Sequence, residues 1–516
     1  MKRFFTFLTV LHGVVAAVWF FGVATALATG LPQTGQAECF DATGNPVDCV
    51  GTGQDGEYQA GSCGANRYMD NGDGTVTDSC TGLMWIKTPD TDGDLDVDTD
   101  DGMLFCDALT HCEALDLAGH SDWRLPNVFE LESIVDYGSV LPAIDTAFFD
   151  VDPGAPTGNL YWSSSRLHTG QSAAVVHFAA GAVTAQNVSS IDEPFPRYVR
   201  AVRSTSGGAG AGGGAVVQAG EGGGAFGGNG DVNGDGSLDL SDAIYTLTYL
   251  FQGGPPPVDF PVAPGGGDCV ETNCNDNVDD DEDGATDCDD FDCIVAANCL
   301  TGELPTTGRT TCWDDRSVGV GEALMIPCAD TGACPGQDGF YQNGCDGDGG
   351  PRFVANFGNN GPDDAGVPVD DTVRDNCTGL EWTRALVDVT GDGVLDASDA
   401  GTNWATALAT CDSISFAGKS DWRLPNAREL LSISTFNPTG TGPAGGSTIE
   451  AIFDNIEIGV ENFHWSSTTT AATSRNTVYG MATARQAKMP ETFNKDGVTQ
   501  TPPMVIRAVR GGQTNN

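Results

Sequence analysis

AGHSDWRLPN at residues 118–127 and AGKSDWRLPN at residues 417–426 are two copies of one stretch that agree at nine of ten positions. In both copies the final Asn is followed three residues later by a glutamate, Glu130 or Glu429. This spacing predicts a capping box, in which the Asn side chain and the Glu carboxylate each accept the other residue's backbone amide. A short helix should therefore follow each stretch, with its apolar residues at helical spacing facing a core.

Other motifs occur in the same order around both copies, so the chain contains a duplicated unit. They are LPQTG (31–35) and LPTTG (304–308), GQDG (53–56 and 336–339), TGLMW (81–85) and TGLEW (378–382), WSSS (162–165) and WSST (465–468), and RAVR (200–203 and 507–510). The units extend over 31–203 and 304–511. A duplicated motif has two explanations: a shared binding function, or the same core in both copies.

Each unit has a mixed α+β pattern. Phe105, Leu109 and Cys112 lie at helical spacing, which predicts a helix before the first WRLPN stretch, and the second unit has a matching run at Trp404. Short alternating runs such as AVVHF (174–178) predict strands. We therefore expect short helices beside small antiparallel sheets.

The composition is strongly acidic, with 72 Asp and Glu against 23 Lys and Arg. This excess argues against nucleic acid and anionic membranes as partners, because both are negatively charged. Residues 204–308 contain no Lys or Arg at all, and their aspartates occur in runs that suit hard divalent cations.

The N-terminus has the features of a secretory signal peptide. Lys2 and Arg3 precede an apolar run that ends in Ala26-Leu27-Ala28, so residues 1–28 should be removed; the alternative is an uncleaved N-terminal anchor. No later segment could span a membrane. The mature protein is then secreted, either extracellular or at the cell surface.

All 17 cysteines follow this leader, in a chain destined for an oxidising compartment, so most should form disulfides. Because 17 is odd, at least one must be free or paired with another chain. Cysteines present in both units suggest the pairs Cys80–Cys112 and Cys377–Cys411. The counterpart of Cys49 in the second unit is either Cys328 or Cys334.

Between the units the chain changes character. Residues 204–230 are a tether rich in Gly and Ala. Two Asp-rich modules follow it, at 231–268 and 269–303, and both units carry an Asp-rich insertion before their first helix.

Four segments match the ligand spacing of a twelve-residue calcium loop, with oxygen donors at alternate positions. The candidate ligands are Asp231, Asn233, Asp235, Ser237, Asp239 and Asp242; Asp279, Asp281, Asp283, Ala285, Asp287 and Asp290; Asp388, Thr390, Asp392, Val394, Asp396 and Asp399; and Asp90, Asp92, Asp94, Asp98 and Asp101. Leu95 replaces the usual Gly at position 6 of the last loop, which ranks that loop last. The alternative is a set of solvated acidic segments without a cation.

The series of motifs from LP-TG through WRLPN to RAVR resembles the bacterial DUF1566 family, named after the C-terminal domain of a collagen-like adhesin of Legionella. The WRLP-x-x-x-EL element also resembles a segment of formylglycine-generating enzymes, which implies a C-type-lectin-like fold. Those enzymes need a cysteine pair late in the domain, and neither unit has a cysteine after Cys112 or Cys411, so their oxidase chemistry is not expected.

The modules between the units have resemblances of their own. Residues 231–257 resemble one half of a dockerin, which implies a cohesin-like partner, although a complete dockerin has two such halves. Residues 274–293 resemble Cys/Asp-rich modules of secreted bacterial proteins.

Catalytic patterns are sparse. Ser163 to Ser165 lack the surroundings of a nucleophile elbow and are interpreted as strand residues. Asp122 beside Arg124 is interpreted as a buried structural ion pair rather than an acid/base pair. Trp123 and Trp422 are expected in the core rather than at a ligand-binding surface.

Two functional classes remain. The favoured one is a secreted, calcium-binding, non-catalytic adhesion protein whose lectin-like domains bind a glycan or a protein. The Legionella relative binds sulfated glycosaminoglycans, but the first unit has 7 basic against 27 acidic residues, which disfavours a polyanionic ligand. The alternative is a dockerin-bearing component of an extracellular polysaccharide-degrading system, with a carboxylate pair as a glycoside hydrolase would need.

Overall fold

The computed structural model describes residues 31–63, 67–94, 97–139, 141–152, 159–167, 172–188, 196–205, 304–314, 324–328, 335–345, 351–356, 371–395, 397–436, 449–450, 452–453, 463–470, 475–482, 491–495 and 504–511. We call residues 31–205 the first half and residues 304–511 the second half. Each half has an arm, residues 31–63 or 304–345, and a body, residues 67–205 or 351–511. The predicted leader and the modules at 231–268 and 269–303 lie outside the described residues, as does the tether beyond residue 205.

A short helix follows each WRLPN stretch, as the spacing predicts. These helices, α3 (Val128–Ser133) and α7 (Ala427–Ser432), both begin with a complete capping box. In α3 the Glu130 amide donates to Asn127 Oδ1 over 2.9 Å, and the Asn127 amide donates to Glu130 Oε2 over 2.7 Å. The box satisfies amides that the first turn of a helix leaves without an intrahelical acceptor.

The arginine of each WRLPN stretch pairs with the capping-box glutamate. Arg124 donates to both carboxylate oxygens of Glu130, over 2.7 and 2.6 Å, and the second copy has the same pair. The predicted pairing of Arg124 with Asp122 is wrong, because Asp122 lies at the surface and accepts a bond from Arg203 over 2.7 Å. The capping box places the Glu130 carboxylate inside the core, where it compensates the charge of the buried guanidinium.

Two small sheets form each body, as expected for an α+β fold. The first body has the sheets β3–β4–β5–β9 (Tyr68–Asp70, Thr75–Asp78, Leu83–Ile86, Val202–Ser204) and β6–β7–β8 (Leu160–Arg166, Ser172–His177, Ala182–Asn187). The second body has β12–β13–β14–β19 (Phe353–Asn356, Thr372–Asp375, Glu381–Thr383, Val509–Arg510) and β17–β16–β15–β18 (Glu491–Asn494, Thr477–Ala482, Phe463–Thr469, Met504–Val505). The pairs in these sheets are antiparallel except β15–β18, which is parallel.

The RAVR stretch ties the end of each body to its beginning. In the first body β9 pairs with β5, and Val202 also forms a bridge with Arg124 of the WRLPN stretch. The second body repeats both contacts, through β19 with β14 and Val509 with Arg423. The chain end of each unit therefore lies between its TGL-W strand and its WRLPN stretch.

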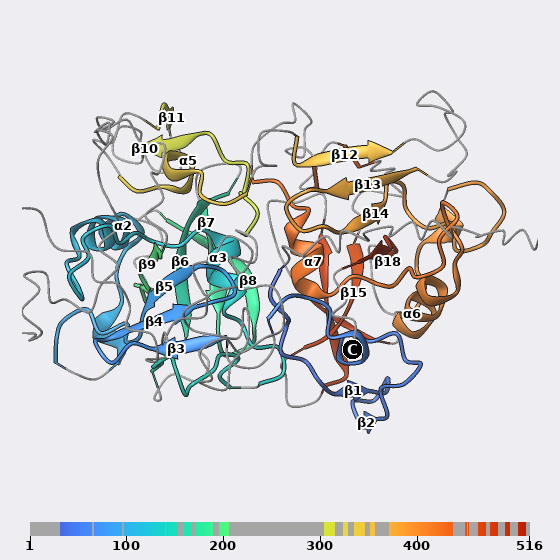
Figure 1. The fold of residues 1–516 in the computed structure, drawn as a ribbon, viewed down its shortest axis with the longest axis horizontal. Helices are drawn as coiled ribbons and strands as arrows, with labels where there is room; N and C mark the ends of the chain where they lie inside the picture. Colours follow the sequence, from blue (N-terminus) through green and yellow to red (C-terminus); the bar gives the residue numbers. More distant parts are fainter. Residues whose placement is uncertain are drawn as a thin grey trace, which may run out of the picture.

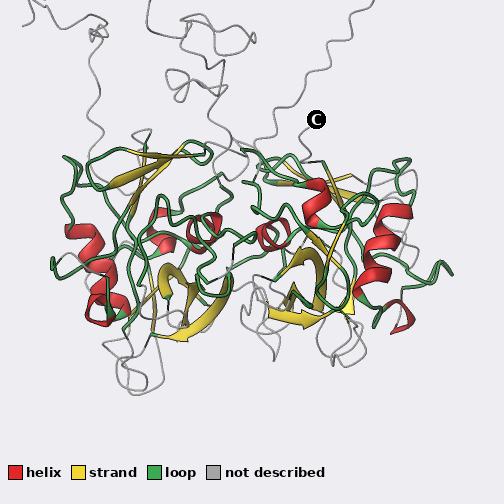
Figure 2. Ribbon diagram, turned by 90° about the horizontal axis from the view of Figure 1, so that it is seen from below, coloured by secondary structure: helices red, strands yellow, loops and turns green. Residues whose placement is uncertain are grey.

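A longer helix lies at the outer edge of each body (Figure 2). These helices, α2 (Phe105–Ala114) and α6 (Trp404–Ser413), match the predicted periodicity. Each packs into an outer core that also contains the tryptophan of the WRLPN stretch, and Trp123 and Trp422 are both 1% exposed. The prediction that these tryptophans belong to the core is confirmed.

The arms are exchanged between the halves. Figure 1 shows β10 (Cys312–Asp314), β11 (Leu324–Ile326) and α5 (Asp338–Tyr341) of the second arm, in yellow, against the blue and green first body. It also shows β1 (Cys39–Phe40) and β2 (Pro46–Val47) of the first arm, in dark blue, against the orange and red second body. Helix α1 (Asp55–Tyr58) contacts β15, and α5 contacts β6. Each arm thus packs against the body of the other half, while a disulfide also ties it to its own body.

One continuous core joins the two halves. It contains residues of both bodies, among them Trp85, Leu131, Trp382 and Tyr479. Helices α3 and α7 contact each other at its centre. Because this core contains apolar residues of both halves, separating them would expose apolar surface.

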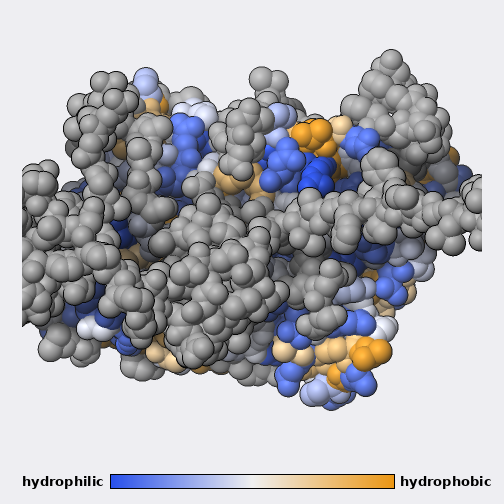
Figure 3. Space-filling view, viewed as in Figure 1, coloured by the Kyte–Doolittle hydropathy of each residue, from blue (hydrophilic) through white to orange (hydrophobic). Residues whose placement is uncertain are grey.

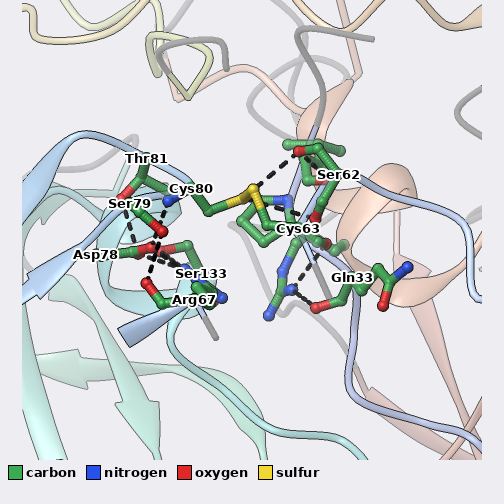
Figure 4. Close-up of a disulfide and its surroundings, with 12 residues drawn as sticks. Gln33, Ser62, Cys63, Arg67, Asp78, Ser79, Cys80, Thr81 and Ser133 are labelled. Carbon is green, nitrogen blue, oxygen red and sulfur yellow. Dashed lines mark hydrogen bonds and ion pairs between the residues drawn. A yellow bond between two sulfur atoms is a disulfide. The ribbon is translucent and has the colours of Figure 1, made fainter. Parts of the chain in front are cut away.

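The disulfides differ from the predicted pairs. Cys80 is bonded to Cys63 and Cys377 to Cys345, whereas Cys112 and Cys411 are free and buried. Figure 4 shows the Cys63–Cys80 bond, which joins the end of the arm to the turn after β4, close to the buried pair of Arg67 and Asp78. The prediction failed because it paired cysteines by their presence in both units, and the arm cysteines recur just as regularly.

A second disulfide closes each arm on itself. Cys39 is bonded to Cys49, and Cys312 is bonded to Cys328. Cys328 is therefore the counterpart of Cys49. Among the described residues Cys112 and Cys411 are free, in agreement with the expectation that at least one cysteine is unpaired.

Within the described ranges, no helix is both long and apolar enough to cross a membrane.

Alkylation should distinguish the two disulfide schemes. In denaturant without reductant, we expect Cys112 and Cys411 to react with iodoacetamide and Cys80 and Cys377 to react only after reduction. Replacing Cys63 and Cys80 together by Ser should lower the free energy of unfolding by about 3 kcal/mol, the chain-entropy value for a loop of this size. A linked Cys80–Cys112 peptide in a non-reduced digest would contradict the structure.

Candidate functional sites

The acidic loop of the first body brings three carboxylates together. Asp90, Asp92 and Asp94 each offer an oxygen, and these oxygens lie within 4.8 Å of one another. The turn that gathers them is held by the Gly93 amide, which donates to Asp90 over 2.6 Å, and by the Asp94 amide, which donates to Asp92 over 3.2 Å. Carboxylates at this separation suit a hard divalent cation. This is the loop that the sequence ranked last.

The pKa of the Asp92 carboxyl is raised. The Asp94 amide lowers it, but burial and the charges of Asp94, Asp101 and Asp90 together outweigh that bond. The cluster therefore stores electrostatic repulsion that a bound cation would remove.

The end of this loop is closed by Asp101 through hydrogen bonds. Its oxygens accept the amides of Thr91, over 2.6 Å, and Asp98, over 2.9 Å, and its side chain is buried. Asp98 caps the short helix η1 (Thr99–Asp101). These two predicted ligands thus hold the loop in shape, while the other three form the open cluster.

The equivalent loop of the second body is closed in a similar way. Asp388 accepts the amides of Gly391 and Gly393, both over 2.7 Å, and Asp399 accepts those of Val389 and Thr390, over 2.9 and 3.1 Å. The pKa of Asp388 is lowered. Burial raises it, but hydrogen bonds from the Gly393 and Gly391 amides and the Thr390 hydroxyl outweigh the effect of burial.

The remaining predicted ligands of this loop are less well defined. Asp392 accepts the Val394 amide over 2.9 Å, whereas Asp396 lies outside the described residues. The two loops of the central modules, 231–242 and 279–290, also lie outside them. The calcium assignments to these three segments therefore stay predictions.

The serines after the WSS tryptophan are strand residues, as predicted. Ser163, Ser164 and Ser165 lie in β6 and are at most 2% exposed. Ser163 donates to the Ala174 carbonyl over 2.7 Å, inside the sheet. Ser165 donates to Asp338 of the second arm over 2.6 Å, so this position of the repeated motif serves the contact between the halves.

A buried aspartate at the start of each arm helix is the feature that sequence reasoning missed. Asp55 accepts hydroxyl bonds from Thr34 of its own arm, over 2.8 Å, and from Thr468 of the second body, over 2.6 Å. Asp338 has the same two kinds of donor, Thr307 over 2.7 Å and Ser165 over 2.6 Å. The repetition of GQDG together with LP-TG in both units was the available signal.

Burial without a cationic partner raises the pKa of both aspartates. For Asp55 burial is the largest effect and raises the pKa to about 6, while the Thr468 and Thr34 hydroxyls lower it, Glu429 raises it and Arg423 lowers it. Its Oδ1 atom has no hydrogen-bond partner among the described residues. The pKa of Asp338 is also raised, chiefly by burial.

A cavity of about 430 Å³ lies where the first arm meets the first body. Tyr68 and Phe148, whose ring centroids are 5.7 Å apart, form its apolar part. Gln33, Gln59 and Asp145 are among its polar lining. Cavities of this size that combine aromatic rings with a few polar groups are typical small-ligand sites.

A matching position exists in the second body but has different side chains. Ile452 stands where the first body has Phe148, and Glu450 stands where it has Asp145. Burial raises the pKa of Glu450. The two halves therefore share a fold but present different surfaces at this point.

Titration should reveal the buried arm aspartates. A folded pKa above the ordinary value of 3.8 means that the folded protein favours the protonated form of Asp55. The contribution of this preference to the free energy of unfolding is complete below about pH 3.8 and is lost as the pH rises through about 6. We expect Asp55→Asn to stabilise the protein at pH 7 by up to about 3 kcal/mol and much less at pH 4, measured by urea denaturation. Asp338→Asn should act in the same direction. Asp41→Asn is the control with the opposite slope, because hydrogen bonds from Asn45 and Thr43 lower the pKa of Asp41. Equal stabilisation by Asp55→Asn at both pH values would contradict the assignment.

Calcium should stabilise the first acidic loop by relieving the repulsion among its carboxylates. We expect the Tm of the full chain to rise in millimolar calcium and to fall again with EDTA, with a gain of about 2.7 kcal/mol per site at a hundredfold excess over Kd. Asp92→Asn should remove one site in calorimetry, whereas the exposed Asp116→Asn should remove none. The same Tm in calcium and in EDTA would refute calcium binding throughout the chain.

Comparison with protein families gives one match, to the model described as Lcl C-terminal domain. It matches residues 74–203 and 371–510, which together make up just over half of the chain. Both matches begin after the exchanged arms. Comparison with curated proteins and with solved structures gave no match.

Proposed function

We propose that this chain, which belongs to the family of the Lcl C-terminal domain, is an extracellular surface or adhesion protein. It would bind a glycan or a protein without catalysing a reaction. The two family domains are its bodies, joined by the exchanged arms into one unit. Disulfides in both arms fit an oxidising, extracellular environment.

The cavity between the first arm and the first body is the single observation that supports a glycan ligand best. The apolar faces of sugar rings stack on aromatic side chains such as Tyr68 and Phe148, while amide and carboxylate groups bind sugar hydroxyls. The C-type-lectin-like relationship implied by the WRLP element agrees with this role.

The ligand should be a neutral or weakly charged glycan. Asp145 and Asp136 both line the cavity, and the first unit is acidic overall. On the face seen in Figure 3, the described residues are mostly hydrophilic, with small apolar patches between them. A polyanion would be repelled by the carboxylates of Asp136 and Asp145, because Arg67, the basic residue of the lining, is already paired with Asp78.

Calcium binding belongs to the same proposal. It is supported by the Asp90, Asp92 and Asp94 cluster and by the ligand spacing of the other three loops. The cation would stabilise the protein rather than bind the glycan, because the cavity lining does not include the cluster.

A glycan array tests this function. Full-length protein without the leader should bind neutral or weakly charged glycans in calcium buffer and leave them intact, as judged by chromatography of the products. Phe148→Ala and Asp145→Asn should each weaken binding at least tenfold. Asp145→Asn keeps an acceptor for the Ala147 amide, so its effect reports on the ligand and not on the turn.

The second body supplies the matched control. Ile452→Ala, at the position equivalent to Phe148, should leave glycan binding unchanged. Loss of binding in Ile452→Ala but not in Phe148→Ala would place the site elsewhere. Release of shortened glycans by the wild type would favour the polysaccharide-degrading alternative.

A further inference from the structure

The contact between helices α3 and α7 breaks the symmetry of the duplication. In the duplicated sequence, Phe129 of α3 corresponds to Arg428 of α7, and Glu132 corresponds to Leu431. Each member of these pairs lies at the junction of the two halves. The two sides of the junction are thus related by the duplication in their backbone but not in their charge.

On one side the contact is between two rings. Phe129 packs edge to face against Phe436 of the second body, with ring centroids 5.7 Å apart. Both side chains are 4% exposed. The buried Arg309 of the second arm donates to the carbonyl of Phe436 over 2.7 Å, so the cation on this side bonds to a carbonyl.

The equivalent contact on the other side is ionic. Arg428 pairs with Glu132 over 3.1 Å, and both side chains are 2% exposed. Glu132 also accepts the Tyr137 hydroxyl over 2.7 Å, and the guanidinium lies 5.8 Å from the centroid of the Tyr137 ring.

Arg428 is also the point where the first arm is held. Its guanidinium donates to the carbonyls of Pro32 and Gln33 over 2.9 and 2.6 Å, and to the carbonyl of Val135 over 2.8 Å. The first arm, the first body and the second body therefore meet at one buried cation.

We propose that the two halves are a fused heterodimer whose halves recognise each other and not themselves, so that the pair holds together without the segment that connects them. The interaction surface of the first half, made of α3, the part of β6 that α5 contacts and its arm, fits the second half of this chain as its partner.

The charges explain why two copies of one half would not pair. Two first halves would bury two Glu132 carboxylates with no arginine, and two second halves would bury two Arg428 guanidinium groups with no carboxylate. A buried charge that loses its partner costs several kcal/mol, so either homodimer would be much weaker than the observed pair.

The exchanged arms add contacts that only the pair can make. Tyr58 donates to Asp412 over 2.9 Å, and Tyr341 donates to Glu113 at the opposite end. Asn127 and Asn426 of the two WRLPN stretches donate to carbonyls in the arm of the other half, Asn343 over 3.4 Å and Ala60 over 3.3 Å. A separated half would expose the surface of its body that the other arm covers and would leave its own arm without these contacts.

Cutting the full chain between the halves tests the proposal. A site for a specific protease is inserted after Gly222. The protein also carries Cys106→Ser, because Cys106 is disulfide-bonded and a covalent link between the cut fragments would mask their non-covalent association. A non-reducing denaturing gel verifies that no covalent link remains after cleavage. We expect light scattering to show one species with the mass of the uncut protein, still paired at nanomolar concentration. Two folded species of half the mass would overturn the proposal.

Variants at the junction test the recognition step. In the cut protein, Glu132→Leu should weaken association at least about a hundredfold because Arg428 loses its carboxylate. Asp116→Asn, at an exposed carboxylate of the same half, is the control and should change association less than threefold. The uncut variants are first compared by circular dichroism, so that a folding defect is recognised.

Glu132→Leu combined with Arg428→Phe gives both halves the same side chains at these positions. We expect this double variant to recover most of the lost affinity and, unlike the wild type, to form pairs of identical halves when cut samples with and without an affinity tag are mixed. Additive effects of the two substitutions, or pairs of identical halves in the wild type, would refute the charge matching.

Discussion

The buried pair of Arg124 and Glu130, with its counterpart in the second half, is the interaction on which the rest of the structure depends. It joins the WRLPN stretch to the first turn of α3, while Arg124 also bridges the final strand through Val202. The same turn presents Asn127 to the arm of the other half. One ion pair thus fixes a helix start, the end of the sheet and the contact between halves. Because the pair is buried, loss of either partner would leave an uncompensated charge in the core.

Duplication has preserved backbone contacts more strictly than side-chain contacts. The capping boxes, the RAVR bridges and the hydroxyl bonds to the arm aspartates occur twice. A buried cation that donates to the carbonyl of an arm aromatic also occurs twice, but it is Arg166 of β6 in one half and Lys495, after β17, in the other. Burial lowers the pKa of Lys495 to about 8. The requirement is a donor at this place, and two different elements meet it.

Arm exchange also shapes the proposed binding function. The cavity exists because the first arm passes over the first body before it crosses to the second, so its lining comes from two segments that are joined by the Cys63–Cys80 bond. A ligand in this cavity would contact the part of the molecule where both halves meet. Binding of such a ligand would therefore be coupled to the integrity of the pair.

Local features were determined by the sequence alone. The capping boxes, helices α2 and α6, the strand at 172–177 and the buried tryptophans follow from spacing within about ten residues, where periodicity and capping govern the structure. The duplicated motifs likewise indicated two related family domains, and the aspartate spacing indicated the loop in which Asp90, Asp92 and Asp94 meet.

Only the tertiary structure decided which partners meet over longer distances. Cys80 could have been joined to several cysteines, and Arg124 had an acidic neighbour two residues away that it does not use. The contacts of Asp55 with Thr468 and of Arg428 with Glu132 join residues about three to four hundred positions apart. A motif repeated in two units is compatible with packing inside one unit or between the two units. The repeated residues are the same in both arrangements, so the sequence alone does not distinguish them. In the folded protein the arms cross, and the shared core contains apolar residues of both bodies together with Leu31 and Leu304 of the arms.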